Sequence, residues 1–350
     1  MLDSLVCSRQ RLRRSLKLRS WRHTARSFIS AAMALCVLLL ALVPLGCSQQ
    51  AGQDTVLNIG LLLGSSGLGD KSFNDSAYSG LLEAQKKYNI RFETVNMGTP
   101  ESNLDALRNF ARNNYDLIIG VAFENLNSIT TVAGEFPNSR FAIIDAEGTG
   151  NNIASVVYRE QEGDFLMGVL AAMLTHTKIV GVIGGTDIPA IRRIMSGFEQ
   201  GVEYQDPSVH VFTEFAGTFS DPEVGLELAL EHYNEGADVI HNAASKTGLG
   251  IIEAARQTQK WTTGTSGDQR YLAPGYMIGN RPKRVDTAVE MLISEVRDGT
   301  FKAGTRSLGL KQDGISIGPF DQTWVTPEMI SRLDELRQEI IDGTIVVQVE

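Results

Sequence analysis

The chain has 350 residues and a formal net charge of −9, with 41 acidic side chains against 32 Lys and Arg. This length allows two domains, each with a hydrophobic core of its own. The acidic balance argues against a protein that binds nucleic acid through phosphate contacts.

The first 46 residues differ in kind from the rest. A stretch with eight Lys and Arg side chains precedes the apolar run 28–45, which ends at Gly46-Cys47. Basic, apolar and small residues before a cysteine are typical of a bacterial lipoprotein signal peptide. We therefore predict a signal peptide over residues 1–46 and lipidation of Cys47. An uncleaved transmembrane anchor stays open, because Pro44 replaces the usual leucine and the run approaches the roughly 20 residues that span a bilayer.

Cleavage would leave Cys47 as the only cysteine, because Cys7 and Cys36 lie in the leader. The folded body would then hold no disulfide, thiol nucleophile or cysteine metal site. Its net charge would be about −16, since the removed residues carry eight basic side chains and one acidic one. Residues 47–54 would form a polar tether to the lipid. We expect neither a cofactor nor a bound metal.

From Thr55 onward, apolar segments typical of strands alternate with amphipathic segments typical of helices. The predicted strands of the first half are 56–63, 91–97, 115–122, 140–146 and 153–158, and its predicted helices are 76–88, 101–113 and 125–136. Such an alternation predicts a parallel sheet covered by helices. We therefore place a first lobe at residues 55–158.

The same alternation resumes after a long predicted helix at 162–175. The next predicted elements are strands 179–184, 209–215 and 238–243, helices 189–204, 222–235 and 249–259, and a polar segment at 262–269. They place a second lobe at 159–269. The last predicted elements are strand 276–279, helix 282–297, a hairpin at 307–317 and helix 327–341. We expect residues 270–350 to complete both lobes, and the boundary near Arg159 to act as a hinge.

One turn of the first lobe is suited to bind a ligand. The glycine- and serine-rich turn 64–69 lies between a strand and a helix, where α/β proteins present backbone N–H groups to ligands. Asp70 and Asn74 then offer an acceptor and an amide suited to the edges of a purine. Tyr78, four residues after Asn74, is placed to stack on a base. The alternative makes Ser72 or Asn74 an N-cap and Phe73 and Tyr78 core residues, and the residues alone leave both open.

The same segment resembles a known family. Residues 69–78, GDKSFNDSAY, resemble the signature D-K-S-F-N-x-S-A-W of the basic membrane protein (BMP) family. Further similar motifs follow in the family's order at 136–145, 162–172, 181–201, 217–221, 236–240 and 264–269. The resemblance implies a type I periplasmic-binding-protein fold, a lipid anchor, and a nucleoside held between two lobes for an ABC permease. It also favours ligand contact for the 70–78 segment.

Two further candidates follow predicted parallel strands, at the edge that faces the crevice between lobes. Phe123 is equally consistent with contact to the ligand and with an ordinary core position. An aspartate after an Ile-Ile strand is costly to bury unpaired, so we expect Asp145 to face the ligand as an acceptor. Lys283 resembles the family's lysine near the sugar, and a solvated helix start is an equal alternative.

Several positions in the second lobe depart from the family's pattern. His241 stands where the family has a second stacking aromatic residue, and we place it at the ligand on that ground. Ser245 and Lys246 replace two glycines that let the backbone approach the ligand. Ser266 replaces the aspartate that grips the ribose, and a neutral hydrogen bond is about half as strong as one to a carboxylate. The purine nucleoside is therefore left open.

We expect an extracytoplasmic solute-binding lipoprotein at the cell membrane that closes on a nucleoside-like ligand and delivers it to an ABC permease. We do not expect an enzyme, because the sequence has no G-x-x-x-x-G-K-[ST], G-x-S-x-G or H-E-x-x-H motif. Two alternatives stay open. One is a ligand-sensing receptor of the same fold, for a sugar or another small solute, that feeds no transporter. The other is an exported enzyme on this fold.

Overall fold

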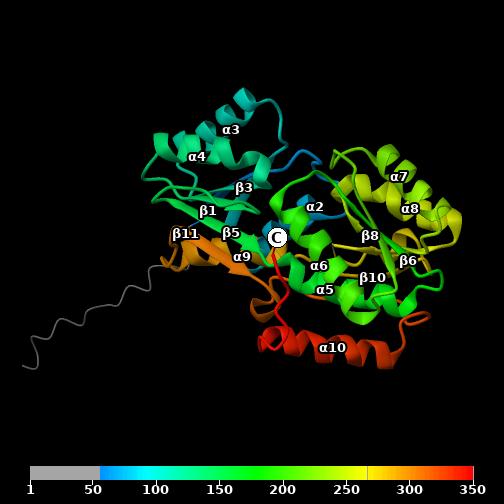
Figure 1. The fold of residues 1–350 in the computed structure, drawn as a ribbon. Helices are drawn as coiled ribbons and strands as arrows, with labels where there is room; N and C mark the ends of the chain where they lie inside the picture. Colours follow the sequence, from blue (N-terminus) through cyan, green and yellow to red (C-terminus); the bar gives the residue numbers. More distant parts are fainter. Residues whose placement is uncertain (1–55, 266, 350) are drawn as a thin grey trace, which may run out of the picture. The chain divides into compact units, whose positions relative to one another are not determined.

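The computed structural model describes residues 56–265 and 267–349. The predicted signal peptide, Cys47 with its tether, and Ser266 lie outside the described residues. Two parallel sheets, each flanked by helices, form two lobes (Figure 1). The predicted α/β architecture with two doubly wound lobes is confirmed.

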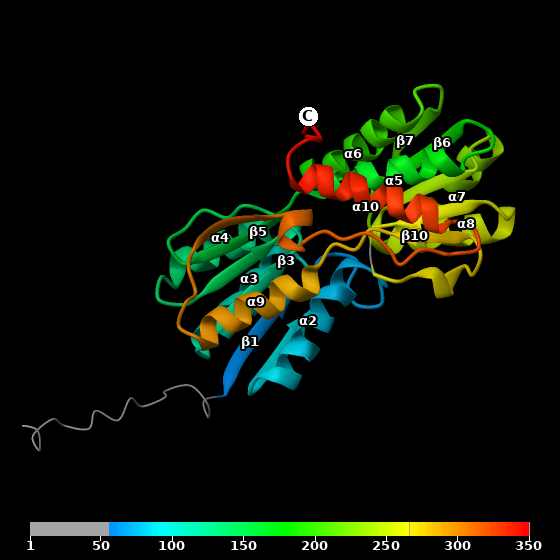
Figure 2. The same ribbon diagram turned by 90° about the horizontal axis from the view of Figure 1, so that it is seen from below.

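The first lobe is built on a six-stranded sheet in the order β11-β5-β4-β3-β1-β2. All its strand pairings are parallel. The strands are β1 (Leu57–Leu62), β2 (Ile90–Val95), β3 (Leu117–Val121), β4 (Phe141–Ile144), β5 (Ile153–Tyr158) and β11 (Gly304–Leu308). The helices are α2 (Phe73–Lys87), α3 (Pro100–Arg112), α4 (Leu126–Glu135) and α9 (Val285–Arg297). Helix α9 lies beside α2 although some 200 residues separate them in the chain (Figure 2).

The second lobe is built on a five-stranded sheet in the order β10-β9-β8-β6-β7, again with parallel pairings. Its strands are β6 (Ile179–Gly184), β7 (His210–Phe215), β8 (Val239–Ala243), β9 (Trp261–Gly264) and β10 (Met277–Asn280). Its helices are α5 (Glu160–Leu174), α6 (Pro189–Gln205), α7 (Pro222–Asn234), α8 (Gly248–Thr258) and α10 (Pro327–Ile341). Short 3₁₀ turns lie at Phe123–Asn125, Ser245–Thr247, Arg270–Leu272 and Leu310–Gln312.

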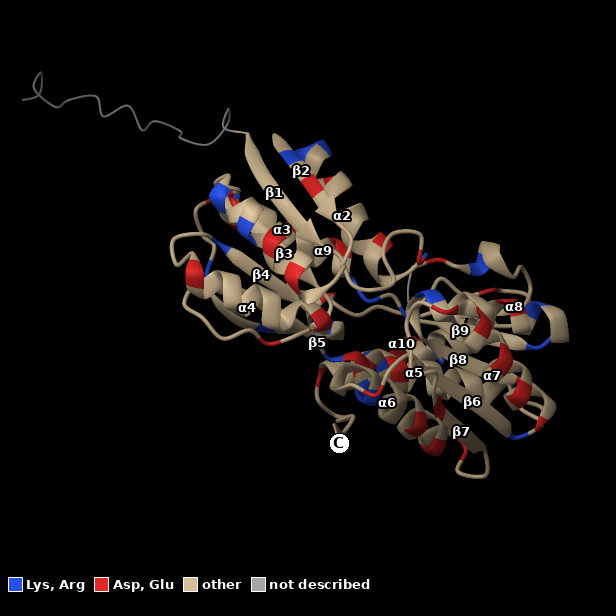
Figure 3. Cartoon of the chain, turned by 90° about the horizontal axis from the view of Figure 1, so that it is seen from above, with Lys and Arg blue, Asp and Glu red and all other residues tan. Residues whose placement is uncertain are grey.

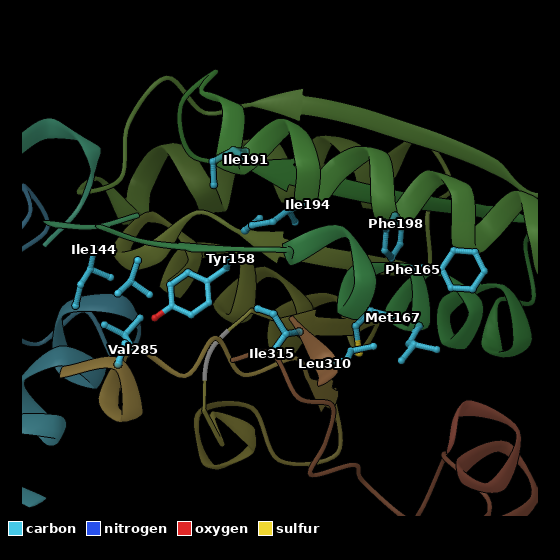
Figure 4. Packing of buried hydrophobic residues seen from close by; sticks show 14 of the residues in the cluster. Ile144, Tyr158, Phe165, Met167, Ile191, Ile194, Phe198, Val285, Leu310 and Ile315 are labelled. Carbon is cyan, nitrogen blue, oxygen red and sulfur yellow. The ribbon is translucent and has the colours of Figure 1, made fainter. Parts of the chain in front are cut away.

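The chain crosses between the lobes at three places. It passes from β5 to α5 at Arg159, from β10 to α9 through residues 281–284, and from β11 to α10 through residues 309–326. The late segments therefore belong to both lobes, since β10 joins the second sheet and β11 the first. Buried side chains, among them Tyr158 and Ile315, lie in this crossing region (Figure 4).

One sequence prediction is wrong in this part of the chain. The expected hairpin at 307–317 is absent from the described residues, because β11 instead pairs in parallel with the free edge of β5 and then enters a 3₁₀ turn. The polar segment 262–269 begins with the buried strand β9. Its hydroxyls are accommodated there because Thr262 Oγ1 donates to the Ile240 carbonyl at 2.8 Å.

Helices α5 and α6 approach each other so closely that only glycine fits at two positions of their contact. A Cβ atom on Gly168 would collide with the carbonyl oxygen of Phe198, and one on Gly201 with that of Phe165. The buried ring of Phe198 lies at this contact (Figure 4).

Within residues 56–265 and 267–349, no helix is both long and apolar enough to cross a bilayer.

Candidate functional site

A cavity lies between the two lobes. Its lining comes from segments after β1, β3 and β4 in the first lobe and after β8 and β9 in the second. These are carboxyl ends of parallel strands, where open α/β sheets bind ligands.

The backbone is strained at three strand ends that border this cavity. Ala122, Asp145 and Ser245 have positive φ angles of 76°, 75° and 51°. Residues with a Cβ atom adopt such angles at a cost of about 1–3 kcal/mol, and strained residues gather at binding sites. The strained positions therefore coincide with the cavity rim.

Three phenylalanine rings line the cavity, Phe73 and Phe123 from the first lobe and Phe219 from the second. Phe123 follows β3 and keeps 36% of its surface exposed, so it is not the core residue that the alternative interpretation made it. Phe219 lies in the segment between β7 and α7. Gly185 leaves room for its ring, because a Cβ atom at Gly185 would collide with Phe219. Phe219 was not among the predicted site residues, although its G-T-F-S-D segment is one of the motifs similar to the family.

Asp70 does not line the cavity, which corrects the prediction that it faces a base. Its carboxylate is fully buried and accepts the backbone N–H groups of Ser72, Asn74 and Asp75 at 2.9, 2.9 and 3.1 Å. It thus satisfies the otherwise unpaired donors at the start of α2. The capping role thus falls to Asp70, a residue that the capping alternative did not name.

Asn74 lines the cavity, but its amide is hydrogen-bonded within the protein. Its Oδ1 accepts the N–H of Gly64 at 2.8 Å, and its Nδ2 donates to Ser66 Oγ at 2.7 Å and to Asp70 Oδ2 at 3.0 Å. The amide therefore ties the turn 64–69 to the helix start.

Tyr78 is not part of the cavity lining. Its ring packs edge-on against Phe92 of β2, with 5.8 Å between ring centroids. The spacing of four residues from Asn74 correctly gives a shared helix side, but the ring turns toward the sheet. The prediction that Tyr78 stacks on a base is corrected accordingly.

His241 is buried in the second lobe and does not line the cavity, contrary to its predicted place at the ligand. Its ring stacks on Phe198, with 5.0 Å between centroids and 4° between planes. Its nitrogens lie 2.7 Å from Thr263 Oγ1 and 2.9 Å from Asp164 Oδ1. Burial lowers the pKa of His241, although Asp164 works in the opposite direction. The ring is therefore held neutral inside the lobe.

A buried ion cluster borders the cavity. Lys283 Nζ lies 2.8 Å from both Asp145 Oδ1 and Glu160 Oε1, and Arg193 Nε lies 2.7 Å from Glu160 Oε2. Lys283 is thus no solvated helix start, since only 9% of its side chain is exposed. Asp145 and Lys283 both line the cavity, and they are paired with each other there.

The cluster perturbs its carboxylates in opposite directions. Burial raises the pKa of Asp145, and the neighbouring charge of Glu160 adds to this while Lys283 opposes it. Burial also acts to raise the pKa of Glu160, but Lys283 and Arg193 outweigh it and the pKa lies below its ordinary value. Glu160 is therefore the more firmly ionised of the two.

Glu124 is a second carboxylate in the cavity lining, and the sequence analysis did not single it out. It accepts the backbone N–H of Ser65 at 3.1 Å and the Ser65 hydroxyl at 2.6 Å.

Elsewhere, acidic and basic segments are interspersed along the helices of both lobes (Figure 3). Among the described residues, no group of three His, Cys, Asp or Glu is placed to hold a metal ion.

Direct hydrogen bonds connect the lobes at the cavity. Ser245 Oγ lies 3.0 Å from Asp70 Oδ2 and 3.1 Å from Ser66 Oγ. Beside them, Gln269 Nε2 donates to the Lys71 carbonyl at 2.9 Å. The structure therefore shows the lobes closed on each other.

Comparisons with known proteins agree with this architecture. The chain is 29% identical to basic membrane protein A of Borreliella burgdorferi, over 89% of this chain and 94% of that protein. It is also 29% identical to an uncharacterized lipoprotein of Pyrococcus horikoshii, over 90% of this chain and 84% of that protein. A solved ABC transporter solute-binding protein from Aeropyrum pernix K1 aligns with a TM-score of 0.77 and 26% identity, over 84% of this chain and 94% of that one.

A family model decides the assignment. The model of the Bmp family, described as ABC transporter substrate-binding protein PnrA-like, matches residues 58–350. This span includes both lobes and every residue that lines the cavity. The chain belongs to the Bmp family of PnrA-like ABC transporter substrate-binding proteins.

Proposed function

We propose that this protein binds a nucleoside, with purine nucleosides the first candidates, in the cavity between its lobes and delivers it to an ABC permease. The observation that carries the proposal is the pair of rings, Phe123 and Phe219, that line one cavity from opposite lobes. A base that stacks on an aromatic side chain gains about 1–3 kcal/mol of binding free energy, and every base can stack in this way. A planar heterocycle is the kind of ligand that benefits from both rings.

Closure supplies the transport signal in this proposal. A ligand that contacts both lobes stabilises the closed arrangement over an open one, because only the closed form offers both sets of contacts. The chain crosses at Arg159, at residues 281–284 and at residues 309–326, and these segments are placed to act as the hinge. The permease then distinguishes loaded from empty protein by shape.

Polar groups near the rings would select among heterocycles. Glu124 supplies a carboxylate, and the Asp145–Lys283 pair supplies an acceptor and a donor at the same cavity. Ligand contact at these residues is part of the proposal. When a ligand binds, Asp145 and Lys283 would exchange their mutual ion pair for hydrogen bonds to the ligand. This exchange would select among ligands at little net cost in binding free energy.

Calorimetric titration of the full chain in detergent with purine and pyrimidine nucleosides tests the proposal. Replacing Phe123 or Phe219 by alanine should weaken binding by roughly 5- to 150-fold, the equivalent of one lost stacking contact. Phe215→Ala is the matched control, because Phe215 is also 36% exposed but does not line this cavity. Equal affinity in all three variants, or no nucleoside binding by the wild type, would refute the proposal.

We also propose that a lipid on Cys47 holds the protein at the outer side of the cell membrane. The support is the leader's pattern together with the lipoprotein name of the Pyrococcus horikoshii relative. Expression with a labelled fatty acid should label the wild type and not Cys47→Ser. Label retained by that variant, or an uncleaved leader in the mature mass, would contradict the anchor.

A further inference from the structure

Arg281 is a fully buried cation with unused donors at the cavity. It follows β10, lines the cavity, and has no solvent-exposed surface. Its Nε donates to Asp164 Oδ1 at 2.9 Å. Its Nη1 and Nη2 find no hydrogen-bond partner among the described residues.

Unpaired N–H donors on a buried guanidinium destabilise the fold, because folding removes their hydrogen bonds to water and supplies no protein acceptor in exchange. Arg carries five N–H donors in a fixed plane, and the contact to Asp164 uses only one of them. Arg281 belongs to the cavity lining but has no accessible surface in this closed arrangement, so a ligand accepts the remaining bonds only when neighbouring lining side chains move aside for it.

The surroundings hold this guanidinium in place. A Cβ atom on Gly163 of α5 would lie 2.7 Å from Arg281 Cγ, so the missing side chain makes room for the stem of Arg281. Asp164 in turn lies 2.9 Å from His241 Nε2, and both side chains are fully buried. This gives the buried His241 a role that the sequence analysis did not foresee, since it positions the carboxylate that orients Arg281.

The charges at the cavity indicate what Arg281 meets there. Two cations in the lining, Arg281 and Lys283, are matched by two carboxylates, Glu124 and Asp145. Asp164, which accepts the hydrogen bond from Arg281 Nε, adds a further negative charge. With no excess of positive charge, the site favours neutral acceptor atoms over a phosphate or another strongly charged group.

We propose that Arg281 determines specificity by donating its Nη1 and Nη2 hydrogens to two adjacent neutral acceptors of the ligand. This inference rests on the proposed nucleoside-binding function. A nucleoside offers such a pair in two places: an oxo group beside a ring nitrogen on a 6-oxopurine, and the vicinal hydroxyls of ribose. The planar fork of Arg matches both, as it does for guanine O6 and N7.

Affinities of the full chain in detergent for inosine, adenosine and 2′,3′-dideoxyinosine test the inference and separate the two sources. Adenosine replaces the oxo acceptor by a donor, whereas dideoxyinosine removes the hydroxyls. We expect the wild type to prefer inosine at least tenfold over one of them. Arg281→Met should reduce that preference to within about twofold, and Arg281→Lys, which keeps the charge without the fork, should fall between.

Folding is controlled separately, because Arg281→Met leaves Asp164 buried without its cation. The double variant Asp164→Asn, Arg281→Met removes both charges, and thermal melting confirms that each variant is folded. Arg270→Met is the matched control, since Arg270 pairs with Asp268 outside the cavity lining.

Three outcomes would contradict the proposal, each at a different point. If Arg281→Met and the double variant keep the wild-type preference in both arms, Arg281 does not determine specificity. If inosine 5′-monophosphate binds more tightly than inosine, the acceptors are charged and the inference is wrong. If the wild type binds no nucleoside, the proposed function itself fails, and the ligand named here fails with it.

Discussion

Ser245 tests how the closed arrangement of the lobes is stabilised. Its hydroxyl contacts Asp70 Oδ2 at 3.0 Å and Ser66 Oγ at 3.1 Å, and both partners belong to the other lobe. A hydrogen bond to a carboxylate contributes about 1.5–3 kcal/mol and a neutral one about 0.5–1.5 kcal/mol. Loss of the hydroxyl should therefore destabilise the closed state by about 2–4 kcal/mol relative to the open state.

Two substitutions separate the hydroxyl from the backbone. Ser245 has a φ angle of 51°, which glycine adopts freely and alanine does not. Ser245→Gly and Ser245→Ala both remove the hydroxyl, so both should reduce closure equally. The free energy of unfolding should be about 1–2 kcal/mol higher for the glycine variant, because it relieves the backbone strain.

Fluorescence energy transfer between dyes on α3 and α7 measures the closed fraction without ligand, and calorimetry measures affinity. A loss of about 2 kcal/mol in closure should weaken ligand binding roughly 30-fold if the free protein is mostly open. An affinity within twofold of the wild type in both variants would refute the role of the hydroxyl. A decrease confined to Ser245→Ala would assign the effect to the backbone instead.

Three further predictions concern stability. Lys283→Met should lower the free energy of unfolding by about 3–5 kcal/mol in urea titrations, because it leaves Asp145 buried without its cation and Glu160 with Arg193 alone. Lys87→Met, at the more exposed pair with Glu290, should have a much smaller effect, and equal losses would contradict this reasoning. Burial lowers the pKa of His241, so the unfolded state takes up its proton first and stability should fall as the pH drops below about 6.5. This slope in thermal melts should be weaker in His241→Asn, and an unchanged slope would show that other groups cause it. Gly168→Ala should lower the melting temperature strongly because its methyl group would collide with Phe198, whereas Gly134→Ala meets open space in α4 and should be neutral or stabilising. Similar melting temperatures for the two variants would mean that α5 and α6 move apart easily.

The alternation of elements was predictable because buried apolar runs and helical periodicity are local properties. Strand β5 and helix α10 begin and end where the sequence places them. The pairing partner of β11 was not predictable from its residues, because a parallel edge is offered by β5, some 150 residues earlier. The local sequence pattern therefore predicts where helices and strands lie, whereas pairing between distant segments decides which sheet a late strand such as β11 joins.

The site was predictable in location but not in the use of each side chain. Phe123, Asp145 and Lys283 lie at the cavity because strand ends determine its position. Asp70, in contrast, is equally suited to a ligand or to free backbone N–H groups, and only the path of the turn decides between them. Arg281, in the polar run N-R-P-K-R, gives no sequence signal of burial, since the neighbouring Gly163 comes from far along the chain.

The central claim is that a nucleoside is held between the two lobes. Native mass spectrometry of the full chain, released from detergent after purification without added ligand, tests this claim most directly. We expect a bound species whose mass, after dissociation, matches a nucleoside, and whose occupancy drops sharply in Phe219→Ala. Retention of a sugar or an amino acid instead, or the same occupancy in Phe219→Ala, would contradict it.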